Sequence, residues 1–82
     1  MDKNIILDRL QEIFREIFDD NTLVIGRETS AEHIEDWDSL NHINLIVAIE
    51  KEFQIKFKLD ELQSLRDVGD TIDLIFVKLK QK

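Results

Sequence analysis

The sequence contains no cysteine and no proline, and it has only two glycines, Gly26 and Gly69. Without cysteine, disulfides and thiolate–metal sites are excluded, so packing has to stabilise the fold. Without proline and with so little glycine, helices can continue between few breaks, and no flexible linker divides the chain. No apolar run reaches the ~20 residues that span a bilayer, which predicts no membrane insertion.

The length and the charge narrow the class of protein further. The chain of 82 residues has room for one small domain, so we predict a single domain over residues 1–82. The start, Met1-Asp2-Lys3-Asn4, leads into a charged segment, which predicts no signal peptide and a cytoplasmic protein. Asp and Glu number 18 against 11 Lys and Arg, and the net charge of −7 disfavours nucleic-acid binding. Partners with basic patches would instead be attracted.

Apolar residues at helical spacing predict an all-α fold, a small four-helix bundle with three main helices and one short helix. The expected helices cover residues 2–18, 38–53, 60–65 and 67–79. Asp2 or Asn4 would cap the first helix and Asp67 the last. A long loop is expected between the first two helices. Residues 55–59 alternate apolar and polar, but no second strand exists to pair with them, so they are read as an extended link.

The long loop carries apolar residues that a mobile linker would not have. They are Leu23, Val24, Ile25, Ile34 and Trp37. We therefore expect the loop to be held against the core, with Trp37 as an anchor. Thr29 and Glu32 have the spacing of a capping box, which predicts a short helical turn around residues 30–34.

The second expected helix is more apolar than one buried face requires. Its two stripes are Leu45, Ile46, Ile49 and Phe53 on one side and Leu40, Ile43 and Val47 on another. In one interpretation the helix is central and both sides are covered by its neighbours. In the other, the second stripe stays partly exposed and docks partners. The pattern leaves both open.

Ser39 stands where this helix begins. Asp38 or Ser39 would be an ordinary N-cap, worth about 1 kcal/mol. A catalytic serine would need a base, and the available His33 and His42 are not arranged for one, since His42 lies on the same helix. A third interpretation is that another enzyme modifies the hydroxyl. A phosphodiester there would lie at the positive end of the helix, and Asp36 and Asp38 would attract a basic modifying enzyme.

The stretch Trp37-Asp38-Ser39-Leu40, with the apolar helix that ends Glu50-Lys51-Glu52-Phe53, resembles the acyl carrier proteins and the wider phosphopantetheine carrier superfamily. Leu65-Arg66-Asp67-Val68-Gly69-Asp70 is similar to the family's start of the last helix. Asp-Ser-Leu is a weak signal alone. Its position in the middle of an acidic helical domain of this length is specific, and the resemblance covers nearly the whole chain.

The resemblance implies a carrier that is not itself an enzyme. Ser39 would receive 4′-phosphopantetheine from coenzyme A by a magnesium-dependent phosphopantetheinyl transferase, and the terminal thiol would hold an acyl group as a thioester. The working thiol would thus belong to the prosthetic group, which explains a carrier without cysteine. The implied partners are the transferase and acyl-transferring or acyl-activating enzymes with basic docking patches. A monomer without a metal site of its own is expected.

The resemblance also implies roles for two sets of residues on the second helix. Asp38, Leu40, Ile43 and Val47 match positions that meet partner enzymes. Leu45, Ile46 and Ile49 match the inner side that can line an acyl pocket. Asn41, Asn44 and Lys51 stand where carriers of fatty-acid synthesis usually have acidic residues, which favours a specialised lipid or secondary-metabolite pathway, such as polyketide synthesis. Gln54 replaces a common closing glycine, which predicts that a left-handed helix cap is strained or absent.

Parts of this pattern are compatible with other functions. A peptidyl or D-alanyl carrier would use the same attachment and differ only in its cargo. An unmodified acidic adaptor would bind partners through the Leu40, Ile43 and Val47 stripe, with Ser39 only a cap. A calcium-binding loop around Gly26 is excluded, because Leu23 and Ile25 would occupy positions that need side-chain oxygens.

Overall fold

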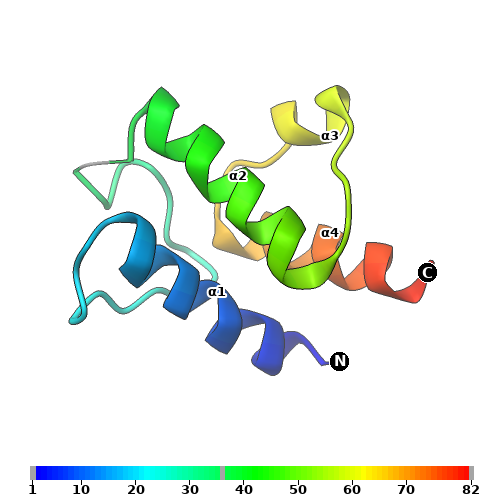
Figure 1. Cartoon of the computed structure of the whole chain (residues 1–82), viewed down its shortest axis with the longest axis horizontal. Coiled ribbons are helices and arrows are strands. Elements are labelled where there is room, and N and C mark those ends of the chain that lie inside the picture. The colour runs from blue at the N-terminus through cyan, green and yellow to red at the C-terminus, as the bar shows by residue number, and fades with distance from the viewer. Residues whose placement is uncertain (1, 36, 82) are drawn as a thin grey trace.

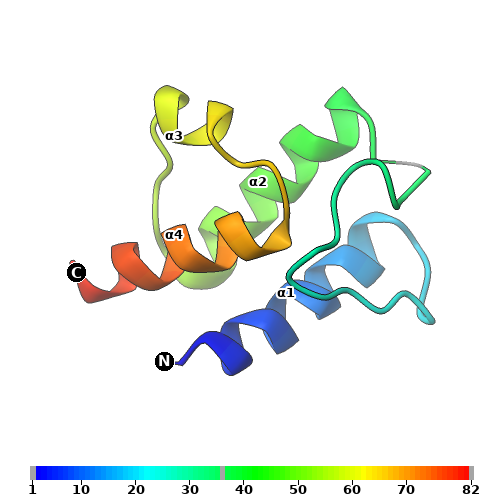
Figure 2. The same ribbon diagram turned by 180° about the vertical axis from the view of Figure 1, so that it is seen from behind.

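The computed structural model describes residues 2–35 and 37–81. These residues form four helices joined by loops, and they contain no strand. In chain order the helices are α1 (Lys3–Ile17), α2 (Ser39–Phe53), α3 (Leu59–Gln63) and α4 (Val68–Lys80). α1 packs against α2 and α4, and the short α3 lies at the edge of the bundle (Figures 1 and 2). The predicted bundle of three main helices and one short helix, with a long first loop, is confirmed. None of the described helices is long and apolar enough to cross a membrane.

Aspartate side chains define the starts of the three long helices. The carboxylates of Asp2, Asp38 and Asp67 each accept a hydrogen bond from the backbone N–H three residues later, at 2.9, 2.9 and 2.8 Å. Each bond satisfies an N–H group that has no partner within the helix, and such caps contribute about 1 kcal/mol. The predicted caps at Asp2 and Asp67 are thereby confirmed.

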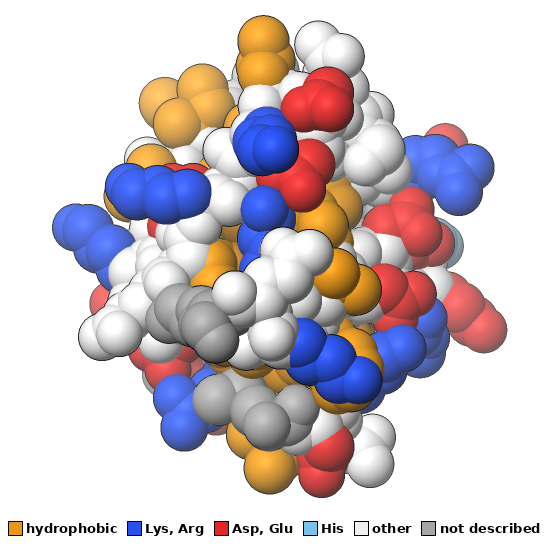
Figure 3. Space-filling model, turned by 90° about the vertical axis from the view of Figure 1, so that its right-hand side faces the viewer, with side chains coloured by type: hydrophobic (Ala, Val, Ile, Leu, Met, Phe, Trp, Pro, Cys, Tyr) orange, Lys and Arg blue, Asp and Glu red, His pale blue; other side chains and the backbone are white. Residues whose placement is uncertain are grey.

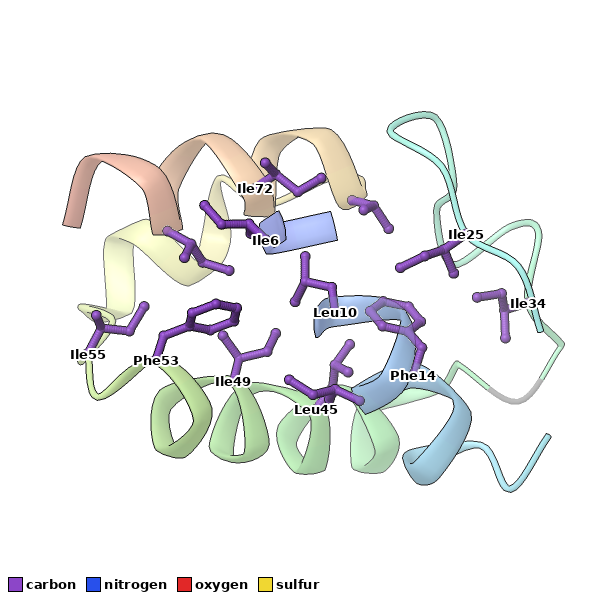
Figure 4. Close-up of a cluster of buried hydrophobic side chains, with 13 residues drawn as sticks. Ile6, Leu10, Phe14, Ile25, Ile34, Leu45, Ile49, Phe53, Ile55 and Ile72 are labelled. Carbon is purple, nitrogen blue, oxygen red and sulfur yellow. The ribbon is translucent and has the colours of Figure 1, made fainter. Parts of the chain in front are cut away.

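One apolar core joins the long helices, the long loop and the link after α2. Its helical side chains are Ile6, Leu10, Ile13 and Phe14 of α1, Leu45, Ile49 and Phe53 of α2, and Val68, Ile72 and Ile75 of α4. The labelled side chains of α2 point towards those of α1 in the middle of the bundle (Figure 4). Phe76 and Leu79 of α4 are half-buried and pack on the margin of this core.

The long loop is fixed to the bundle, as its apolar residues predict. Ile25 and Ile34 are buried in the core, whereas Val24 is 74% exposed and does not anchor the loop. The N–H of Gly69, at the start of α4, donates to the carbonyl of Arg27 at 2.8 Å. A Cβ atom at position 69 would lie 3.0 Å from that carbonyl oxygen, so glycine permits this close approach of loop and helix.

Ion pairs join α4 to the long loop, to α1 and to α3. Asp73 of α4 pairs with Arg27 of the loop at 3.1 Å and with Lys3 of α1 at 3.1 Å. The Arg27 guanidinium and then the Lys3 ammonium lower the pKa of the Asp73 carboxyl. Glu61 of α3 pairs with Lys78 of α4 at 2.8 Å, and this ammonium, with the N–H of Lys58, lowers the pKa of Glu61.

Two local predictions are wrong. The expected capping box at Thr29 does not form, because the Thr29 hydroxyl accepts a hydrogen bond from the N–H of Gly26 at 2.9 Å, and residues 31–33 form a turn that is not helical. α3 begins one residue earlier and ends two residues earlier than predicted. The N–H of Lys58 donates to the Glu61 carboxylate at 2.7 Å, and this bond fixes the start of the helix at Leu59.

At the end of α2, Gln54 was predicted to leave the left-handed helix cap strained or absent. Gln54 has φ 56° and ψ 50°, the left-handed conformation, and its N–H donates to the carbonyl of Glu50. The left-handed cap is therefore present, and a residue with a Cβ atom adopts it. Such a residue is disfavoured in this conformation by about 1–2 kcal/mol.

Candidate functional site

Ser39 is the first residue of α2, and the helix does not need its hydroxyl. Asp38 is the N-cap, so the choice between Asp38 and Ser39 is resolved in favour of Asp38. Ser39 is exposed, and its hydroxyl makes no hydrogen bond with any described residue. The other hydroxyls of the chain all make hydrogen bonds. They belong to Thr22, Thr29, Ser30, Ser64 and Thr71.

Trp37 anchors the loop immediately before Ser39. Its indole meets the ring of Phe14 edge-on, with centroids 5.2 Å apart, and that of Phe18 at 6.3 Å. Its Nε1–H donates to Nδ1 of His42 at 3.1 Å, and the two rings stack with centroids 6.1 Å apart. The predicted anchoring role of Trp37 is confirmed. The contact with His42 was not predicted, because it joins a loop to a helix and no helical or strand spacing signals it.

The described side chains around Ser39 contain no general base for its hydroxyl. Nδ1 of His42 accepts from Trp37, and Nδ1 of His33 accepts from the N–H of Ser30 at 3.1 Å. Neither histidine bonds to Ser39. Within the described ranges, no three His, Asp or Glu side chains are grouped so that they would hold a metal ion. The geometry thus supports a hydroxyl that another enzyme modifies more than a nucleophile activated from within.

An open hollow with a volume of about 560 Å³ lies at Ser39. One wall comes from the loop and the other from the start of α2. The lining residues are Ala31, Trp37, Asp38, Ser39, His42 and Ile43. Ala31 and His42 had not been predicted to lie here, since only the fold brings the loop beside α2. Asp36, which was expected to attract a modifying enzyme, lies outside the described residues.

The two apolar stripes of α2 have different environments. Leu45, Ile46 and Ile49 are buried, with exposed fractions of 2%, 8% and 0%. Leu40, Ile43 and Val47 are 68%, 60% and 44% exposed. Of the two arrangements that the sequence left open, the second therefore holds, and α2 presents an apolar stripe to solvent directly after Ser39.

The start of α2 fits a phosphate ester on Ser39. The N–H groups of Ser39 and Leu40 have no acceptor within the helix, and this end of the helix has a partial positive charge. Such N–H groups bind phosphate oxygens in many proteins. The carboxylate of Asp38 opposes a second negative charge, but the open hollow leaves an attached group free to extend away from it.

Comparisons with known proteins point to one family. A family model described as a phosphopantetheine attachment site matches residues 8–75. An acyl carrier protein from Acidothermus cellulolyticus is 35% identical over 75 residues, covering 92% of this chain and 89% of that protein. The solution NMR structure of holo acyl carrier protein from Geobacter metallireducens matches with a TM-score of 0.86 at 55% identity, covering 92% of this chain and 86% of that one. The crystal structure of an acyl carrier protein from Thermotoga maritima matches with a TM-score of 0.84 at 25% identity, covering 99% and 94%.

These matches extend over the helices and include the position of Ser39. Acyl carrier proteins are non-catalytic carriers, and the family implies interaction with acyl-handling enzymes and with a phosphopantetheinyl transferase. The chain belongs to the acyl carrier proteins, and its cofactor is covalently bound 4′-phosphopantetheine.

Proposed function

We propose that Ser39 is the attachment residue and that the protein carries acyl intermediates as thioesters on the thiol of the attached arm. The supporting observation is the state of the hydroxyl. It is exposed at the start of α2 and makes no hydrogen bond with a described residue, whereas every other serine and threonine hydroxyl does. No helix cap would have to be broken to modify it, because Asp38 provides the cap.

The transfer from coenzyme A would form one bond and break one bond. The oxygen of Ser39 would bond to the phosphorus of the pantetheine phosphate, and the pyrophosphate bond would break so that the nucleotide leaves. The hydroxyl proton would go to the transferase or to water, since no described side chain is hydrogen-bonded to Ser39.

The exposed stripe of α2 would contact partner enzymes, and the buried stripe would line the acyl pocket. Asp38, Leu40, Ile43 and Val47 would contact partner enzymes, and the exposure of the three apolar side chains supports this role. Leu45, Ile46 and Ile49 would line the acyl pocket. They are at most 8% exposed, so an acyl chain would have to part α2 from its neighbours in order to reach them.

The composition of α2 bears on which pathway this carrier serves. Asn41, Asn44 and Lys51 leave α2 without the acidic face expected of a carrier in fatty-acid synthesis, so we favour a specialised lipid or secondary-metabolite pathway. A single domain over residues 1–82, acting as a cytoplasmic monomer, remains the expectation from the sequence. A peptidyl or D-alanyl cargo would use the same attachment.

The test is the intact mass of the purified protein before and after incubation with coenzyme A, magnesium and a broad-specificity phosphopantetheinyl transferase. We expect one added phosphopantetheine on the wild type and none on Ser39→Ala. Ser30→Ala and Ser64→Ala are matched controls and should be modified like the wild type. Modification of Ser39→Ala would contradict the proposal. The proposal would also be contradicted if the folded wild type were not modified by any of several transferases, and this result would favour an unmodified adaptor.

A further inference from the structure

The net charge of the chain lies entirely before Ser39. Residues 1–38 contain 11 Asp and Glu against 4 Lys and Arg, a balance of −7, and residues 39–82 contain 7 of each. The connecting residues 18–38 alone contain 7 acidic residues and one basic residue, a balance of −6. The negative field of the protein therefore originates mainly from the long loop that leads to Ser39.

The loop carboxylates face solvent, where their charge can attract a partner. The only basic residue of the loop, Arg27, is paired with Asp73 of α4 at 3.1 Å, so it is occupied outside the loop. The six described carboxylates of the loop are all exposed. They belong to Asp19, Asp20, Glu28, Glu32, Glu35 and Asp38. Ala31, the neighbour of Glu32, lines the hollow at Ser39, so the acidic loop forms one side of the surface around the serine.

The other side of that surface, the first eleven residues of α2, carries no charged side chain. Residues 39–49 contain no Asp, Glu, Lys or Arg. Further along, Glu50 accepts a hydrogen bond from the N–H of Phe57 at 2.9 Å, and Glu52 pairs with Arg9 at 2.7 Å. Lys51 is exposed, makes no ion pair with a described residue and lines an open hollow together with Val47 and Glu50, whose carboxylate offsets its charge.

The end of the bundle away from Ser39, where α1 begins and α4 ends, carries side chains of both signs close together (Figure 3). Charges of opposite sign that are interspersed in this way largely cancel at a distance. The excess negative charge near Ser39 is therefore not matched by a second acidic surface at the far end.

We propose that the phosphopantetheinyl transferase docks with a basic surface against the loop and with an uncharged, apolar surface along α2. This inference rests on the proposed function, because it assumes that Ser39 is the residue presented to the transferase. The loop carboxylates attract the basic surface, and the stripe of Leu40, Ile43 and Val47 provides the apolar contact. A transferase turned the other way would place its basic surface against Glu50 and Lys51, whose charges offset each other.

The separation of the charges fixes this orientation. Ser39 and Lys51 are twelve residues apart on one helix, which is about 18 Å at 1.5 Å per residue. This is more than two Debye lengths of about 8 Å at physiological salt. The loop carboxylates therefore give almost no attraction to a basic group at the far end of α2, where the charges of Glu50 and Lys51 offset each other.

Charge reversals at single positions test the orientation with the intact apo protein. The measurement is kcat/KM for modification by a broad-specificity phosphopantetheinyl transferase with coenzyme A and magnesium, at low and at high ionic strength. Glu32→Lys should lower kcat/KM about five- to tenfold at low ionic strength, as loss of electrostatic steering does. Asp8→Lys, an equal charge change at an exposed position of α1, should stay within about twofold, and so should Lys51→Glu.

The salt dependence separates steering from damage to the fold. The difference between Glu32→Lys and the wild type should nearly disappear at about 1 M salt, where the Debye length is about 3 Å, whereas a folding defect would persist. An unchanged rate for Glu32→Lys, or a several-fold faster reaction of Lys51→Glu, would overturn the inference and place the basic surface along α2. Absence of any modification of the wild type would instead contradict the proposed function and, with it, this inference.

Discussion

Replacing His42 by leucine tests how strongly the long loop is held to α2 beside Ser39. The substitution removes the Nδ1 acceptor, 3.1 Å from the indole nitrogen of Trp37, and the ring that stacks on the indole. A hydrogen bond contributes about 0.5–1.5 kcal/mol net, and a ring pair contributes a similar amount. Because Trp37 is only half-buried, water can replace part of the lost hydrogen bond. We therefore expect the free energy of unfolding to fall by about 1–2 kcal/mol.

The assay is thermal unfolding followed by circular dichroism and by the fluorescence of Trp37, the only tryptophan of the chain. For a domain of this size, each kcal/mol corresponds to about 4–8 °C, so Tm should fall by about 5–15 °C. The emission of Trp37 should also change, since its ring loses a neighbour on one face. His42→Asn is the matched variant, because its amide oxygen can still accept the hydrogen bond. It should lose less stability than His42→Leu.

The same variant has a functional readout. Trp37 and His42 both line the hollow at Ser39, so a loosened loop should lower kcat/KM for phosphopantetheinylation even where the protein is fully folded. A Tm within about 1 °C of the wild type, with unchanged Trp37 emission, would refute the reasoning. The contact would then be a consequence of the packing of Trp37 on α1 and would not hold the loop.

Three further substitutions address single residues elsewhere in the fold. Gln54→Gly should raise the free energy of unfolding by about 0.5–1 kcal/mol in denaturant titrations, because glycine adopts the left-handed cap without strain; a decrease would contradict this. Asp38→Ala should lower the free energy of unfolding by about 1 kcal/mol, because the N-cap of α2 is lost. The same denaturant titration measures this change, and an unchanged midpoint would mean that the cap contributes nothing. Arg27 and Lys3 lower the pKa of Asp73, so its ion pairs stabilise the protein above the ordinary Asp pKa of about 4 and are lost as the pH falls below it. Asp73→Asn should therefore lower Tm near neutral pH and reduce its decline in acid, and a parallel decline in both proteins would exclude this role.

Features that depend on a few neighbouring residues were predictable from the sequence. The caps at Asp2 and Asp67 act on N–H groups three residues away, and the helical spacing of apolar residues repeats within a single element. The all-α class and the approximate helix bounds follow from such signals. The Asp38-Ser39-Leu40 stretch, placed in the middle of an acidic helical chain, was sufficient to predict the family.

The sequence by itself thus determined the approximate bounds of the long helices, the caps of the first and last helices and the family, whereas only the tertiary structure decided how the surface around Ser39 is built. The pattern of α2 contained two apolar stripes, and which of them is exposed depends on where α1 and α4 pack. The position of the acidic loop beside an uncharged α2 also depends on contacts that form only in the folded chain, such as those of Trp37 with Phe14 and Phe18. Periodicity and capping act over a few residues, but the surface that a partner meets is formed by packing between distant segments, and no local pattern encodes that packing.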